Sequence, residues 1–172
     1  MTDRDDSLHA PTGVSCDGFD PLPRGVAAFS DLANAHRLAR DCAGRLRHAH
    51  GLGWMVFDGT RFTRDESAAA RVAQRAARKL LQLSRALARR ALHEPDPAEA
   101  RRQAKQYAKW AKNSQQASRL QATLKVAKTL RDIACAPEAF DADPMALNVA
   151  NGTLDLRTGL LRAHRVDDLV TR

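Results

Sequence analysis

Apolar and polar positions follow a helical rhythm that begins near residue 30 and continues for about a hundred residues. Before it, residues 1–29 carry three prolines among glycines, serines and mixed charges without a sustained period, which predicts a flexible tail. Ser30 or Asp31 can cap the first helix, and residues 30–172 are expected to form the structured part. Its apolar side has five members at helical spacing: Leu32, Ala35, Leu38, Ala39 and Cys42.

Two short β-prone runs come next, at residues 54–57 and 61–63, on either side of Asp58-Gly59. An Asp-Gly pair between such runs favours a type I′ turn, because both central positions of that turn need a positive φ. A β-hairpin over residues 54–63 is therefore predicted.

Helices are predicted over most of residues 66–133. The first, over residues 66–92, follows the potential cap Asp65 and contains neither glycine nor proline. The second has a start signal in Asp96 as the cap and Pro97 at the first helical position, and it should end near residue 111.

The third helix is expected to open at Asn113 or Ser114 and to reach Ile133. Its predicted buried side consists of Leu120, Leu124, Ala127, Leu130 and Ile133.

The pattern then changes to extended runs. The runs LNVA and TLDL are separated by Asn151-Gly152, and Arg157-Thr158-Gly159 turns the chain into LLRAH, so a three-stranded meander is predicted over residues 147–165. Together these elements indicate a mainly α fold with small β elements, of the α+β class: a helical domain with an N-terminal hairpin and a C-terminal meander.

Composition supports this fold class. Hydrophobic residues make up 44% of the chain but aromatic ones only 5%, so the core must come mainly from Leu, Ala and Val. The three cysteines lie far apart without ligand spacing, which argues against a disulfide framework and a zinc site. The N-terminus lacks the pattern of a signal peptide and no segment approaches a membrane span, so a cytoplasmic protein without membrane contact is expected.

Charge is distributed unevenly. The net charge is +8, and residues 66–136 alone hold 16 Lys and Arg against 5 Asp and Glu. On the helix over residues 66–92, five arginines share one narrow face, opposite an apolar side of Ala and Leu. We call this face the arginine stripe; it consists of Arg71, Arg75, Arg78, Arg85 and Arg89.

Two partners could neutralise the arginine stripe. Like charges four residues apart repel on a helix, and no acidic residue is interleaved to relieve them. Nucleic acid phosphates, single-stranded DNA above all, are one candidate. The other is intramolecular pairing with Asp58, Asp65, Asp141 or Asp143, and a plain solvated helix face is a third interpretation.

A second basic group surrounds Trp110. Trp110 and Tyr107 lie at helical spacing and are more typical of a core than of a base-stacking platform. The basic residues of this group, which we add to the candidate nucleic-acid-binding set, are Lys105, Lys109, Lys112 and Arg119.

Catalytic chemistry has no convincing set of residues in this sequence. There is no G-x-x-x-x-G-K-[ST] motif to hold a nucleoside triphosphate, and no catalytic residue, metal ligand set or cofactor is predicted. Asp141 and Asp143 could bind a metal from a strand, but such a pair more often caps or solvates a turn. The chain is not expected to be an enzyme on its own.

Four stretches resemble a known family: SDLANAHRL, GWMVFDGTRFTRD, KWAKNSQQASRL and DADPMALNVANGTLDLRTGLLRAHRVDDLVTR. In this order they are similar to the helical domain that precedes the helicase motor in phage, plasmid and poxvirus-type primase-helicases. The resemblance covers about residues 30–172. Phe62 stands where the family often has Trp, a change that keeps an aromatic ring.

The resemblance implies a role in DNA replication beside a hexameric, ATP-hydrolysing helicase, with a primase domain upstream. ATP hydrolysis and primer synthesis cannot be assigned to any residue present here. We expect a short reading frame, a fragment or a remnant of a mobile element that binds single-stranded DNA or braces a helicase ring. The alternatives are an interaction module for an intact helicase or primase subunit, and a hydrolase by family association only.

Overall fold

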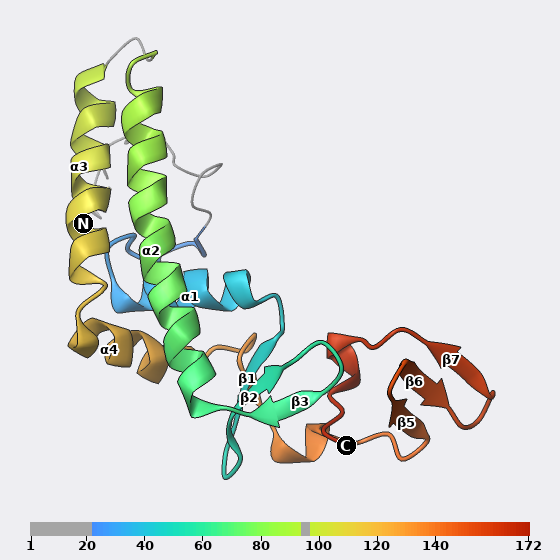
Figure 1. Ribbon diagram of the computed structural model, residues 1–172. Coiled ribbons are helices and arrows are strands. Elements are labelled where there is room, and N and C mark those ends of the chain that lie inside the picture. Colours follow the sequence, from blue (N-terminus) through green and yellow to red (C-terminus); the bar gives the residue numbers. More distant parts are fainter. Residues whose placement is uncertain (1–21, 94–96) are drawn as a thin grey trace, which may run out of the picture.

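The computed structural model describes residues 22–93 and 97–172. Its fold is mainly helical with two small sheets (Figure 1), which confirms the predicted α+β class. Of the tail predicted to be flexible, residues 1–21 lie outside the described residues. The predicted cap Asp96 also lies outside them. The helices are α1 (Asp31–Cys42), α2 (Glu66–Arg90), α3 (Pro97–Asn113) and α4 (Ala117–Ala127).

Helix α1 begins where a cap residue allows it. The Ser30 hydroxyl accepts the Ala33 N–H at 3.0 Å, which satisfies one of the free donors at the helix start. At the other end Ala43 takes a left-handed φ of 45°, and its N–H bonds back to the Arg40 carbonyl. Four of the five predicted apolar positions are buried, whereas Leu32 is 40% exposed.

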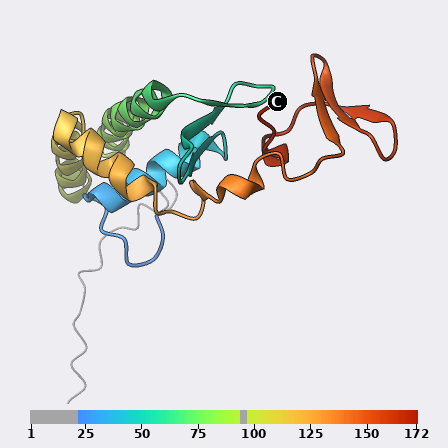
Figure 2. The same cartoon turned by 90° about the horizontal axis from the view of Figure 1, so that it is seen from below.

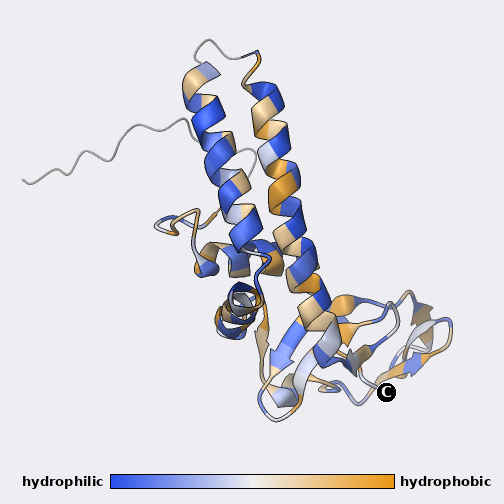
Figure 3. Ribbon diagram, turned by 60° about the vertical axis from the view of Figure 1, so that its left-hand side comes forward, coloured by the Kyte–Doolittle hydropathy of each residue, from blue (hydrophilic) through white to orange (hydrophobic). Residues whose placement is uncertain are grey.

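Helices α2 and α3 form an antiparallel pair that extends away from the rest of the molecule (Figure 1). Asp65 caps α2 by accepting the Ala68 N–H at 2.8 Å. Figure 3 shows both hydrophilic and apolar residues along the two helices, and their apolar side chains pack into one cluster. This cluster consists of Leu80, Leu87, Ala104, Tyr107 and Ala111, with Leu81, Leu83 and Trp110 packed against it.

Helix α4 is shorter than the sequence predicts. Its first residue follows Gln116, whose side chain makes no cap bond, rather than Asn113 or Ser114, and it ends six residues before Ile133. Ile133 is nevertheless fully buried, because its carbonyl accepts the His48 N–H at 2.8 Å and draws the chain into a sheet. Strand pairing thus overrides the helical pattern of this segment.

The first sheet has the strand order β3-β2-β1-β4. The strands β2 (Gly53–Phe57) and β3 (Phe62–Arg64) form the predicted hairpin. The predicted type I′ turn is wrong, because residues 58–61 form the loop and Asp58 lacks a positive φ. Two strands had no clear sequence signal: β1 (Leu46–Ala49), antiparallel to β2, and the two-residue β4 (Ala134–Cys135), parallel to β1. β4 has only two residues, and the apolar and polar residues of β1, LRHA, do not alternate.

The main core lies where α1, α2 and α4 pack on this sheet. Its members are Ala35, Leu38, Ala39, Cys42, Leu46, Trp54, Ala69, Ala73, Ala76, Leu124, Ala127 and Ile133.

The second sheet is the C-terminal meander, with β5 (Ala146–Val149), β6 (Gly152–Asp155) and β7 (Leu160–Arg162) in sequential order. It lies at the opposite end of the molecule from the helices (Figure 2). Its first turn differs from the prediction: Val149 pairs with Gly152, so the central residues are Ala150 and Asn151. A Cβ at Gly152 would overlap the Arg162 carbonyl oxygen, and close packing therefore explains this glycine better than turn geometry.

A third cluster joins the C-terminal segment to the first sheet. Phe62 is 1% exposed and its ring meets that of Phe140 at 5.4 Å. The Phe62 N–H donates to the Val170 carbonyl at 2.7 Å. The aromatic ring at position 62 is therefore a packing residue, in agreement with the interpretation from sequence.

A buried polar network fixes α1 against α3 and the α3–α4 turn. The Asn34 Oδ1 accepts from Arg37 Nη1 at 3.0 Å and from Trp110 Nε1 at 3.1 Å. Its Nδ2 donates to the Ser114 hydroxyl at 3.0 Å. Arg37 Nη2 adds a bond of 2.8 Å to the Ala28 carbonyl, so the side chains of Asn34 and Arg37 together connect four segments of the chain.

Replacing Asn34 should destabilise the fold strongly. Asn34→Ala leaves the Trp110 indole N–H and the Arg37 guanidinium without their shared acceptor, which should lower the free energy of unfolding by about 2 to 3 kcal/mol. Urea unfolding followed by circular dichroism measures this change. As a control, the exposed Gln106→Ala on α3 should change stability by less than about 0.5 kcal/mol. Equal losses in the two variants would contradict a central role for Asn34.

Acid should weaken the ion pair between Asp143 and Arg157 beside the meander. Asp143 accepts two hydrogen bonds from Arg157, at 2.7 and 2.9 Å, and the Met145 N–H. The Arg157 bonds lower the pKa of Asp143 from 3.8 to about 2. Because the folded pKa lies below the unfolded one, this stabilisation is complete above about pH 4 and is lost as the pH falls toward 2.

Carboxyl chemical shifts measured during an acid titration by NMR test this prediction. Arg157→Gln should return the pKa of Asp143 most of the way to 3.8, whereas Arg165→Gln, at a neighbouring exposed arginine, should leave it unchanged. A pKa that does not respond to Arg157→Gln would show that another group holds the carboxylate.

Candidate nucleic-acid interface

The arginine stripe lies on the exposed side of α2. All five of its residues are exposed, while the opposite side of the helix is buried in the core, as the wheel geometry predicts. Ala69, Ala73, Ala76, Leu80 and Leu87 are buried there and Leu83 is half-buried. The helix is thus held by one side and presents the stripe to solvent.

One of the five arginines has an intramolecular carboxylate partner. Arg71 Nη2 lies 2.7 Å from Oδ2 of Asp65, the N-cap residue of the same helix. Within residues 22–93 and 97–172, no carboxylate lies within ion-pair distance of the other four, and Arg78 bonds only to the Gln74 carbonyl at 3.3 Å. Intramolecular pairing therefore accounts for Arg71 and leaves most of the positive charge of the stripe uncompensated.

The other aspartates proposed as partners bind elsewhere. Asp58 Oδ1 accepts the N–H groups of Thr60 and Arg61 in its own turn. Asp141 bonds to Thr171 and lies 3.5 Å from Arg172, and Asp143 is held by Arg157 as described above. These carboxylates fix local structure and do not reach α2.

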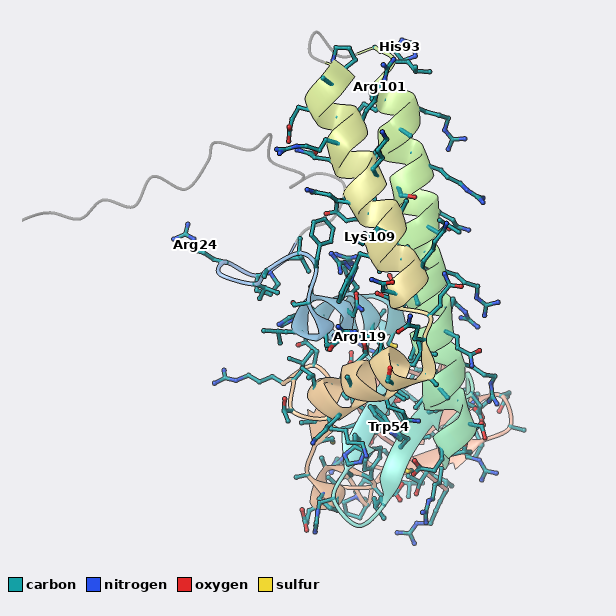
Figure 4. All side chains as sticks on the ribbon, turned by 90° about the vertical axis from the view of Figure 1, so that its left-hand side faces the viewer. Arg24, Trp54, His93, Arg101, Lys109 and Arg119 are labelled. Atoms are coloured by element: carbon teal, nitrogen blue, oxygen red, sulfur yellow. The ribbon has the colours of Figure 1, made fainter. Side chains whose placement is uncertain are left out.

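The second basic group is only partly available. Lys105, Lys109 and Lys112 are exposed on α3, and Figure 4 labels Lys109 on α3 and Arg119 on α4 below it. Arg119, however, lies 2.8 Å from Asp31 and stacks over the Trp110 ring at 5.2 Å. Its charge stabilises the contact between α4 and the start of α1, so Arg119 differs from the lysines in what it can offer a ligand.

The aromatic residues of α3 are structural. Tyr107 is 4% exposed and its ring meets Phe29 edge-on at 5.0 Å, while Trp110 donates to Asn34 from a half-buried position. Tyr107 is therefore a core residue, and the Arg119 guanidinium lies over the ring of Trp110.

Two further cations lie beside the arginine stripe, and the sequence analysis did not select either of them. Arg45 follows α1, and Lys79 lies one turn after Arg75; both line a surface cavity with Arg71 and Arg75. Lys79 also pairs with Asp41 on α1 at 3.1 Å. Lys79 could have been found as a neighbour of the stripe on the helical wheel, but the position of Arg45 depends on the tertiary fold.

Metal-ligating side chains do not gather into a cluster in the part of the chain that the structure describes. Among residues 22–93 and 97–172, no group of three or more His, Cys, Asp or Glu side chains could hold a metal ion, and no helix is long and apolar enough to cross a membrane. Cys42 is buried, which raises the pKa of its thiol to about 11 and keeps it protonated at neutral pH. The candidate site is thus a charged surface.

The sequence matches the model of the D5 N-terminal-like family over residues 35–172. The chain belongs to this family. The match covers all of α2, α3, α4 and both sheets, and it makes the chain a replication-associated domain of the kind found in the N-terminal part of D5-type primase-helicases of phages, plasmids and poxviruses. No curated protein and no solved structure gave a match.

Proposed function

We propose that this D5 N-terminal-like domain binds single-stranded DNA without sequence preference through the arginine stripe of α2, beside a helicase ring. The observation that carries the proposal is the row of exposed arginines, four of which have no carboxylate within ion-pair distance among the described residues. From Arg71 to Arg89 the row extends about 27 Å along the helix. It offers a straight track of positive charge to a polyanion.

Arginine chemistry fits a phosphate backbone. The guanidinium group is planar, stays charged at all accessible pH values and can donate two parallel hydrogen bonds to one phosphate. Contacts of this kind position a strand but carry no base information. The exposed lysines of α3 add positive charge farther along the helical pair.

Neutralising the stripe should weaken DNA binding and reduce its salt dependence. For single strands each phosphate contact contributes about 0.7 to the slope of log K against log salt. The triple variant Arg75→Gln, Arg78→Gln, Arg85→Gln should therefore lose about 2 from this slope and bind a labelled oligothymidylate at least tenfold more weakly in low salt. Fluorescence anisotropy at several salt concentrations gives both values.

A control variant with the same change in net charge separates the stripe from overall charge. Arg131→Gln, Lys125→Gln and Arg165→Gln alter exposed residues outside the stripe. This variant should keep most of the affinity and most of the slope. Equal weakening in both triples would show that net charge, and not the surface of α2, attracts the DNA.

A second candidate, association with a helicase or primase subunit, is favoured by one observation. The meander places Leu147, Leu154 and Leu161 in adjacent register on one face, and Leu147 and Leu161 remain 47% and 48% exposed. Leu147→Ser with Leu161→Ser should abolish co-purification with a D5-type helicase while leaving DNA affinity intact. Undiminished co-purification would remove this face from consideration.

A further inference from the structure

A two-lobed groove separates α1 from α2 and continues the arginine stripe toward the first sheet. The first lobe is a cavity of about 350 Å³, and the second, of about 270 Å³, adjoins it. Asp41, Ala76 and Lys79 border both lobes, so the Asp41–Lys79 ion pair forms the boundary between them. The first lobe falls at the small end of the range of ligand-binding cavities, about 300 to 1,000 Å³.

The first lobe has a cationic rim. Arg45, Arg71, Arg75 and Lys79 border it, against the single carboxylate of Asp41, which Lys79 already pairs. Arg71 pairs with Asp65 from outside the lobe. Among the described residues, Arg45 and Arg75 have no carboxylate within ion-pair distance, so an anion entering the lobe would meet two guanidinium groups that need no partner to be displaced.

The floor of the lobe is apolar. Val56 and Val72 are half-buried and pack against the main core, and the buried Leu46 and Ala76 line the same lobe. A simple anion would gain nothing from this floor. A ligand with an anionic group and an apolar or flat body would use both parts of the lobe, which is the chemistry of a nucleotide.

The fold holds the rim in place. Arg45 leaves the end of α1 with its N–H on the Cys42 carbonyl at 2.8 Å, and its own carbonyl accepts the Phe57 N–H at 2.9 Å. The backbone at residue 45 therefore connects α1 to the end of β2. Arg75 comes from the opposite wall, on α2, which α1 crosses in Figure 1.

We propose that the first lobe of the α1–α2 groove seats one nucleotide of the bound single strand, with its phosphate between Arg45 and Arg75 and its base and sugar against Val56 and Val72. This inference rests on the proposed function and goes beyond it, since the stripe alone would bind the backbone without any contact to a base. The strand is favoured over a free nucleotide because Arg71 and Arg75 belong to both the groove and the stripe.

The test compares two strands of equal phosphate number: a dodecamer of thymidylate and a dodecamer whose sugars are abasic. The wild-type protein should bind the thymidylate strand about tenfold more tightly in anisotropy titrations. Val72→Phe fills the lobe without changing any charge, and it should remove this preference while the salt slope stays the same. Val72→Thr, nearly isosteric, provides a second variant and should reduce the preference partially.

Arg89→Gln is the matched control, because it belongs to the stripe but lies far along α2 from the lobe. It should weaken binding of both strands equally and keep the preference for bases. Equal wild-type affinity for the two strands would overturn the groove proposal and leave the proposed function standing. Failure of both strands to bind would overturn the proposed function itself.

Free thymidine monophosphate and inorganic phosphate distinguish the source of the ligand. Under the proposal, neither displaces the thymidylate strand at concentrations below the millimolar range. Displacement by the mononucleotide at micromolar concentration, with inorganic phosphate inactive, would assign the lobe to a free nucleotide and overturn its assignment to the strand.

Discussion

The carboxamide of Asn34 holds together the parts of the molecule on which the positive surface depends. Its oxygen is shared by an arginine of α1 and the indole of α3, and its nitrogen reaches the serine just before α4. Buried polar groups of this kind are costly unless every member is satisfied, and a satisfied network specifies one arrangement of the helices. By fixing α1 beneath the helical pair, Asn34 also sets the wall of the groove that carries Asp41 and Arg45.

Much of the fold could be predicted from local signals. Ser30 and Asp65 predicted the starts of α1 and α2, because their side-chain oxygens accept hydrogen bonds from free backbone N–H groups. Helical spacing predicted the apolar side of α2. The errors arose where pairing between distant strands decides the secondary structure. β4 has only two residues and β1 shows no alternation of apolar and polar residues. Residues 128–133 leave the helix where the Ile133 carbonyl accepts the His48 N–H and leads the chain into β4.

The candidate site divides in the same way. The arginine stripe is a property of one helix, so its geometry could be read from spacing alone. Its state of charge compensation could not, because only the fold shows that Asp65 takes Arg71 and that Asp141 and Asp143 bind near the C-terminus. Arg119 was also predicted to bind nucleic acid, but it forms an ion pair with Asp31 and stacks over the Trp110 ring. Both partners lie elsewhere in the sequence, so spacing alone could not show these contacts.

Cys42 gives the floor of the groove a chemical character of its own. Nearby guanidinium and ammonium groups would favour a thiolate, but burial outweighs them and raises the pKa of the thiol to about 11. A sulfur kept in its protonated form reacts slowly with peroxide, disulfides and alkylating agents. A nucleotide seated in this groove, as proposed, would lie beside a thiol that stays protonated, and its binding would stay reversible.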